Sequence, residues 1–81
     1  MRIRLTDDGR MLQGTATQIV QTMRSLALGR ETVPLGEYID WVADQLSRLK
    51  EVRLDVGGET DDDKAQKLVA ELLRTGLAKM L

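Results

Sequence analysis

The chain has 81 residues, of which 13 are acidic and 12 basic, and it contains neither cysteine nor histidine. This composition excludes a disulfide scaffold and the usual Cys and His zinc sites, so neither reinforcement of small domains is present. A single core of this size is marginal, and we therefore expect one small domain over residues 1–81 that associates with itself or with a partner.

The first predicted element is an antiparallel hairpin. Residues 2–6 alternate charged and apolar side chains, which is the period of a half-buried strand. Asp8-Gly9 is typical of a two-residue type I′ turn, which would place Leu5 opposite Leu12. The inward side chains are then Ile3, Leu5 and Leu12, and the outward ones are Arg4, Thr6, Met11 and Gln13.

The segment 15–28 is the clearest amphipathic helix. Thr15 and Gln18 have the spacing of a capping box, and Gly29 is placed to end the helix in a left-handed conformation. The apolar stripe consists of Ala16, Ile19, Val20, Met23, Leu26 and Ala27. The opposite face is polar but almost uncharged, which is a weak mark of an interface, and consists of Thr17, Gln18, Gln21, Thr22 and Ser25.

A second helix is expected from about residue 35 to residue 49, with Pro34 near its first turn. Its predicted buried stripe is Leu35, Ile39, Val42, Leu46 and Leu49. The alternating stretch 52–56 predicts the third strand, and Gly57-Gly58 would end it.

Thr60 is the predicted cap of a third helix, with Asp61–Asp63 in its first turn, where carboxylates favour the positive end of the helix dipole. Its apolar face consists of Ala65, Leu68, Val69, Leu72 and Leu73. Gly76 should end the helix after Arg74. The apolar tail of Leu77, Met80 and Leu81 is expected to dock back onto the body.

These elements predict an α+β fold in the order β-β-α-α-β-α. We expect a small three-stranded sheet, made of the N-terminal Asp-Gly hairpin and a third strand, with three helices packed on one face. The direction of the third strand stays open.

The residue types do not favour catalysis or metal binding. Without Cys and His the commonest nucleophiles and bases are absent, and a chain this short has little room for a substrate pocket. The acidic loop 55–63 could attract calcium, but its spacing does not match an EF-hand, and helix-start carboxylates explain residues 61–63. We therefore predict no enzyme activity, no cofactor and no metal site.

Trp41 is the strongest indication of function. It lies on the charged side of the second helix, and tryptophan is strongly enriched in protein interfaces. Tyr38 would add a second anchor. The residues predicted to rim this site are Glu37, Asp44 and Arg48. The alternative is that the hairpin or the C-terminal tail folds over the indole and makes it part of the core.

Three arginines suggest a second kind of surface. Arg2, Arg4 and Arg53 would all project from the sheet face that points away from the helices, where they could contact phosphates. Asp55 on the same face would dilute the charge, and no aromatic residue lies there to stack on bases.

We accordingly predict a cytoplasmic, non-catalytic protein-interaction module, acting as a homodimer or as an accessory subunit of a larger assembly. Its anchors would be Trp41 and Tyr38. The less favoured alternative is a nucleic-acid-associated regulator, antitoxin-like or repressor-like, that uses the sheet-face arginines. No stretch is long and apolar enough to suggest a membrane span.

Overall fold

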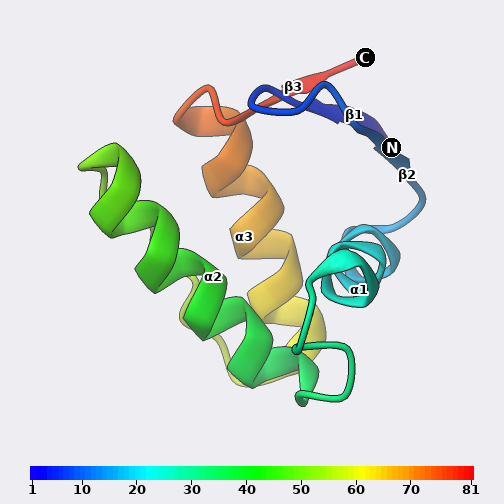
Figure 1. Cartoon of the computed structure of the whole chain (residues 1–81), viewed down its shortest axis with the longest axis vertical. Helices are drawn as coiled ribbons and strands as arrows, with labels where there is room; N and C mark the ends of the chain where they lie inside the picture. Colours follow the sequence, from blue (N-terminus) through cyan, green and yellow to red (C-terminus); the bar gives the residue numbers. More distant parts are fainter.

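The computed structural model describes all residues from 1 to 81 and has an α+β architecture of one three-stranded sheet and three helices (Figure 1). The strands are β1 (Arg2–Leu5), β2 (Met11–Gln13) and β3 (Ala78–Met80), and the helices are α1 (Ala16–Leu26), α2 (Leu35–Lys50) and α3 (Asp61–Arg74). Strand β1 lies between β2 and β3, and both pairings are antiparallel. Figure 1 shows the sheet over α1 and the C-terminal end of α3, with α2 set apart from the strands.

The third strand lies in a different part of the chain from the one predicted. It is formed by the C-terminal tail, which turns at Gly76 and pairs with β1 so that Lys79 lies opposite Arg4. Backbone hydrogen bonds of 2.9 Å from Thr6 N–H to the Leu77 carbonyl and from Leu81 N–H to the Arg2 carbonyl extend the pairing. The tail docks back as expected, but as a strand that follows α3.

The stretch 52–56, predicted as that strand, is extended but pairs with no strand. Its alternate residues Leu54 and Val56 are buried, which accounts for the alternating pattern. Its backbone is held by α3 instead: Asp55 N–H donates to Glu71 Oε1 at 2.9 Å, and Arg74 Nη2 donates to the Arg53 carbonyl at 2.9 Å. Alternation of apolar and polar residues therefore shows that one side of an extended segment is buried. It does not show which strand, if any, the segment pairs with.

The hairpin forms, but its register differs from the prediction by two residues. Leu5 N–H donates to the Arg10 carbonyl, so Ile3, not Leu5, lies opposite Leu12. The connection is the four-residue loop 6–9, in which Gly9 alone has a positive φ, of 72°. Because the shift is an even number of residues, each side chain keeps its predicted face.

The predicted capping box of α1 is confirmed, with Gln18 N–H donating to Thr15 Oγ1 and Thr15 N–H donating to Gln18 Oε1. The helix ends at Leu26, earlier than expected. Gly29, with a φ of 81°, belongs to the turn that follows and does not end the helix itself.

The ends of α2 and α3 lie close to the predicted ones. Thr60 caps α3 by accepting a hydrogen bond from Asp63 N–H, and α3 ends at Arg74. Helix α2 reaches Lys50, and its last turn extends past the neighbouring elements. Leu49 in this turn is 74% exposed, so its predicted place in the buried stripe is wrong.

The core lies between the sheet and the helices and contains only apolar residues, except for the amphipathic Tyr38. Its most buried side chains are Ile3, Ile19, Val20, Ile39, Leu68, Val69 and Leu72. Helices α1 and α3 pack against each other and against the strands, whereas α2 packs only on these two helices. None of the three helices combines the length and the apolar character that crossing a bilayer requires.

Candidate functional site

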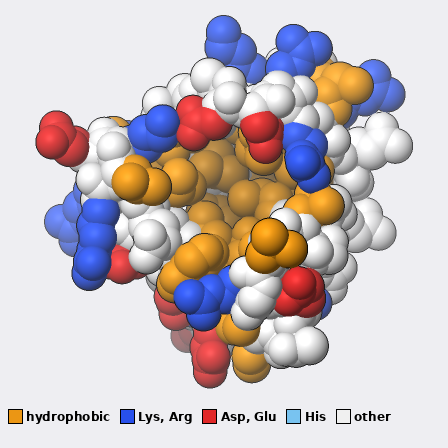
Figure 2. Space-filling model, viewed as in Figure 1, with side chains coloured by type: hydrophobic (Ala, Val, Ile, Leu, Met, Phe, Trp, Pro, Cys, Tyr) orange, Lys and Arg blue, Asp and Glu red, His pale blue; other side chains and the backbone are white.

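The apolar interior is open to the surface between α2 and the β1-β2 hairpin. Because α2 packs on the other helices and not on the strands, a groove separates it from the hairpin. Figure 2 shows this groove as a hollow with a hydrophobic floor and charged side chains around it. It consists of two adjoining cavities of about 290 and 200 Å³ that share Leu5, Asp8 and Met23.

The groove takes its lining from the hairpin and all three helices. The larger cavity is lined by the apolar residues Leu5, Met23, Trp41, Val42, Leu46, Leu72 and Leu77. The smaller one adds Leu12, Leu26, Ala27 and Tyr38. Of these side chains, Leu5, Met23, Leu46 and Leu77 are only half-buried, whereas Leu12 and Leu72 are buried beneath them.

Trp41 forms part of the wall of the larger cavity and is half-buried. The Arg30 guanidinium lies over its ring, 4.4 Å from the centroid, which is the geometry of a cation–π contact. The ring of Tyr38 lies 6.1 Å away at an interplanar angle of 37°. The indole is thus held in one orientation, with part of its surface left accessible.

Tyr38 does not stand on the surface as the sequence suggested. Its side chain is only 3% exposed and belongs to the core cluster, while also lining the smaller cavity. Burial raises the pKa of its hydroxyl above the ordinary value. Tyr38 therefore supports Trp41 from within, and only Trp41 keeps the accessible surface expected of an anchor.

The residues predicted as a rim do not surround the groove. Asp44 and Arg48 form an ion pair of 3.3 Å with each other, and neither they nor the exposed Glu37 line either cavity. The helical spacing around Trp41 gives the residues next to it on α2 but does not show toward which neighbouring element the ring points.

The polar residues that do line the larger cavity are Asp7, Asp8 and Gln45. Both carboxylates have cationic partners: Lys50 Nζ lies 3.1 Å from Asp7, and Arg10 Nε lies 3.7 Å from Asp8. The sequence could not place them, because the hairpin loop reaches α2 only through a tertiary contact. The groove therefore has an apolar floor, and the negative charges at its edge are neutralised by neighbouring cations.

The sequence-predicted arginines are only partly brought together. Arg2 and Arg4 lie on the outer face of the sheet, but Arg53 lies in the extended stretch beside α3, because that stretch is not a strand. The third basic residue of the outer face is Lys79, opposite Arg4 on β3. It was missed because the tail was not recognised as a strand.

The acidic stretch before and within α3 is engaged in contacts of the fold. Asp62 accepts hydrogen bonds from the Thr17 hydroxyl and from Gln66 Nε2, and Asp63 N–H bonds the Thr60 cap. No cluster of three or more His, Cys, Asp or Glu side chains is arranged to hold a metal ion. The carboxylates of the first turn of α3 are accounted for by the helix dipole and these contacts.

No protein-family model matches the chain, and no curated protein or solved structure shows significant similarity to it.

Proposed function

We propose that this chain is a non-catalytic protein-interaction module whose groove binds apolar side chains of a second protein chain. The observation that carries the proposal is the open apolar floor between α2 and the hairpin, with Trp41 on its wall. Exposed apolar surface of this kind is costly in water, and tryptophan is among the side chains that contribute most to protein interfaces.

The lining favours a protein over a small polar ligand. Sites for small molecules combine apolar walls with a few polar groups that fix orientation. Here the larger cavity offers only Gln45 and the two carboxylates of Asp7 and Asp8, which are already paired with cations. Leucine or methionine side chains from another chain would suit such a cavity.

The occupant that the surface favours is a second copy of this chain. A two-fold dimer needs a protrusion and a hollow on the same surface. Leu28 is 94% exposed and directly follows Ala27, which lines the smaller cavity. Leu49 is 74% exposed and lies one helical turn after Leu46, which lines the larger one. Apolar protrusions thus flank the apolar hollow.

The test is sedimentation equilibrium of the wild type and of two variants, one on each half of the contact. Trp41→Ala changes the hollow and Leu28→Ser changes the protrusion. Each is expected to weaken dimerisation at least about tenfold, which corresponds to about 1.4 kcal/mol. Because Leu28 is almost fully exposed, its replacement should leave the unfolding temperature unchanged.

Met11→Ser is the matched control, because Met11 is also an exposed apolar residue, at 59%, but lies on the outer face of the sheet. It should leave dimerisation as it is. A wild type that stays monomeric at millimolar concentration contradicts the homodimer, and a dimer weakened by Met11→Ser but not by Leu28→Ser places the contact elsewhere.

A further inference from the structure

The outer face of the sheet, which points away from the helices, carries basic residues without acidic partners. Arg2 and Arg4 on β1 and Lys79 on β3 are all exposed, and none forms an ion pair within 4.0 Å. By contrast, Arg10, Arg48, Lys50, Lys64 and Arg74 each have a carboxylate partner. Three of the cations that have no carboxylate partner therefore lie together on this face.

Two of these cations lie directly opposite each other. Arg4 pairs with Lys79 across the β1-β3 ladder, so two like charges occupy neighbouring positions on the same face. Such a pair destabilises a sheet, typically by a few tenths of a kcal/mol up to about 1 kcal/mol. The fold gains nothing from it, whereas a bound polyanion would neutralise both charges.

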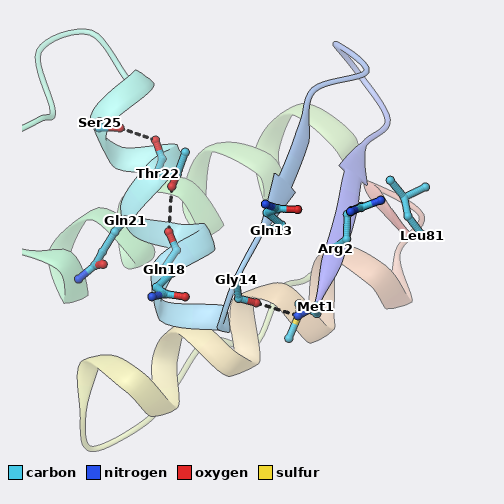
Figure 3. Close-up of a pocket in the computed structure, with 9 residues that line it drawn as sticks. All are labelled: Met1, Arg2, Gln13, Gly14, Gln18, Gln21, Thr22, Ser25 and Leu81. Carbon is cyan, nitrogen blue, oxygen red and sulfur yellow. Dashed lines mark hydrogen bonds between the residues drawn. The ribbon is translucent and has the colours of Figure 1, made fainter.

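An open cleft of about 930 Å³ continues this face from Arg2 and Gln13 to α1. Figure 3 shows Arg2 and Gln13 on neighbouring strands and Gln18, Gln21, Thr22 and Ser25 along the helix. The amide oxygen of Gln18 is used by the α1 cap, which leaves its NH₂ group free to donate. Amide and guanidinium donors of this kind are the usual partners of phosphate oxygens.

The elements that form the face and the cleft carry a positive net charge. The three strands and α1 together carry four basic residues, Arg2, Arg4, Arg24 and Lys79, and no acidic residue. The whole segment 9–30 is free of Asp and Glu, although the chain as a whole has a net charge of −1. The acidic residues are confined to the hairpin loop, α2, α3 and the segments before these two helices.

We propose that the outer sheet face and the adjoining cleft bind the sugar–phosphate backbone of a nucleic-acid duplex. Three cations supply the electrostatic contact, and the glutamines of the cleft add hydrogen bonds to phosphate and sugar oxygens. The face has no aromatic side chain for stacking on unpaired bases, which favours a duplex over a single strand. The glutamine side chains of the cleft also suit the phosphate and sugar oxygens of a polynucleotide better than an anionic lipid surface, which basic patches bind through charge alone.

The experiment measures fluorescence anisotropy of a labelled duplex of about 16 base pairs, titrated with the full chain at salt concentrations from about 20 to 200 mM. Three phosphate contacts predict a slope of about −2.7 for the logarithm of the association constant against the logarithm of the salt concentration. Over that tenfold range of salt the affinity should therefore fall about 500-fold.

Arg4→Gln and Lys79→Gln each remove one contact and should each make the slope shallower by about 0.9. Each also relieves the repulsion between the two side chains, so the unfolding temperature should stay the same or rise. Weaker binding with unchanged or higher stability excludes misfolding as the cause. Lys67→Gln is the matched control: Lys67 is an exposed, unpaired lysine of α3, away from this face, and its replacement should leave the slope unchanged.

Three results would overturn the proposal. The first is no binding to the duplex at the lowest salt concentration, and the second is the same slope in Arg4→Gln and Lys79→Gln as in the wild type. The third is binding to vesicles rich in phosphatidylserine, dependent on Arg4 and Lys79, without binding to the duplex, which would identify a lipid surface as the target.

Discussion

The groove and the outer sheet face lie on different sides of the hairpin and have opposite chemistry. The groove is apolar, and the charges at its margin, Asp7 and Asp8, are paired with Lys50 and Arg10. The outer face is cationic, and its charges are unpaired. A domain of this size thus exposes both an apolar floor and a like-charged pair, each of which costs stability unless another molecule covers it.

The contrast also shows that the outer face is unsuited to self-association. Two copies meeting there would bring Arg4 and Lys79 of each chain together, and like charges oppose such a contact. The groove has no such obstacle, because its charges balance within one copy. The two surfaces should therefore respond separately to mutation and to salt.

The largest effect is expected from a charge placed in the groove. Leu46→Asp would bury an unpaired carboxylate in the contact, and dimerisation should weaken at least about 100-fold, or about 3 kcal/mol. Sedimentation equilibrium measures this, with Leu46→Met as the volume-conserving control. Binding to a duplex should persist in the folded Leu46→Asp monomer, and its loss would show that the two surfaces are coupled.

A charge reversal on the other surface comes next. Arg4→Glu turns the repulsion with Lys79 into an attraction, so the stability measured by urea unfolding should rise by up to about 1 kcal/mol. The same change removes one phosphate contact and adds repulsion, which should weaken duplex binding at least about tenfold at low salt. An accompanying loss of the dimer would contradict the separation of the two surfaces.

Glu71→Gln tests a contact that stabilises the fold and lies away from both surfaces. Glu71 accepts hydrogen bonds from Asp55 N–H and from Arg74, and these bonds hold its pKa below the ordinary value of 4.5. At pH 7 the variant should be less stable than the wild type, while dimerisation and duplex binding of the folded protein stay unchanged.

The pH dependence of that difference follows from the lowered pKa. A carboxylate with a depressed pKa in the folded state stabilises the protein above its unfolded pKa, and this contribution is lost as the pH falls through the folded value. The stability gap between wild type and Glu71→Gln should thus be constant from pH 7 to about 5 and close in stronger acid. Urea unfolding at a series of pH values measures it, and a gap that persists at pH 2 would refute the role assigned to the ionised carboxylate.

The smallest effect is expected from salt on dimerisation through the groove. Because the contact is apolar, raising the salt concentration from about 50 to 500 mM should change the dimer dissociation constant less than about threefold. Sedimentation equilibrium at both concentrations measures it. A steep salt dependence would mean that charged residues, and not the floor of the groove, hold the two copies together.

Local signals in the sequence predicted the helices well. The Thr15 and Gln18 capping box, the Thr60 cap and the stop before Gly76 depend on residues close in the chain, and all three are found in the structure. The α+β class and the N-terminal hairpin also follow from periodicity and from the Asp8-Gly9 turn signal.

The errors arose where distant segments decide the outcome. Residues 52–56 and 78–80 both had apolar side chains to bury, and only the position of α3 determines which of them reaches β1. The hairpin register differs because the loop spans residues 6–9, and Lys50 of α2 contacts it at Asp7. Neither outcome can be read from a window of neighbouring residues.

The same limit applies to the candidate site. The sequence leaves open whether Trp41 is an interface anchor or part of the core, and in the structure the ring is half-buried. The groove beside it exists because α2 does not contact the strands, which no local pattern shows. Tyr38 was misplaced for a related reason: its position on the helix allowed either burial or exposure, and packing against the core determined burial.

Trp41 is the only tryptophan of the chain, so quenching of its fluorescence by iodide reports directly on the groove. We predict that the quenching constant falls as the protein concentration rises through the range in which the mass doubles from 9.1 kDa. A quenching constant that stays the same while the mass doubles would show that two copies meet elsewhere and would contradict the role proposed for the groove.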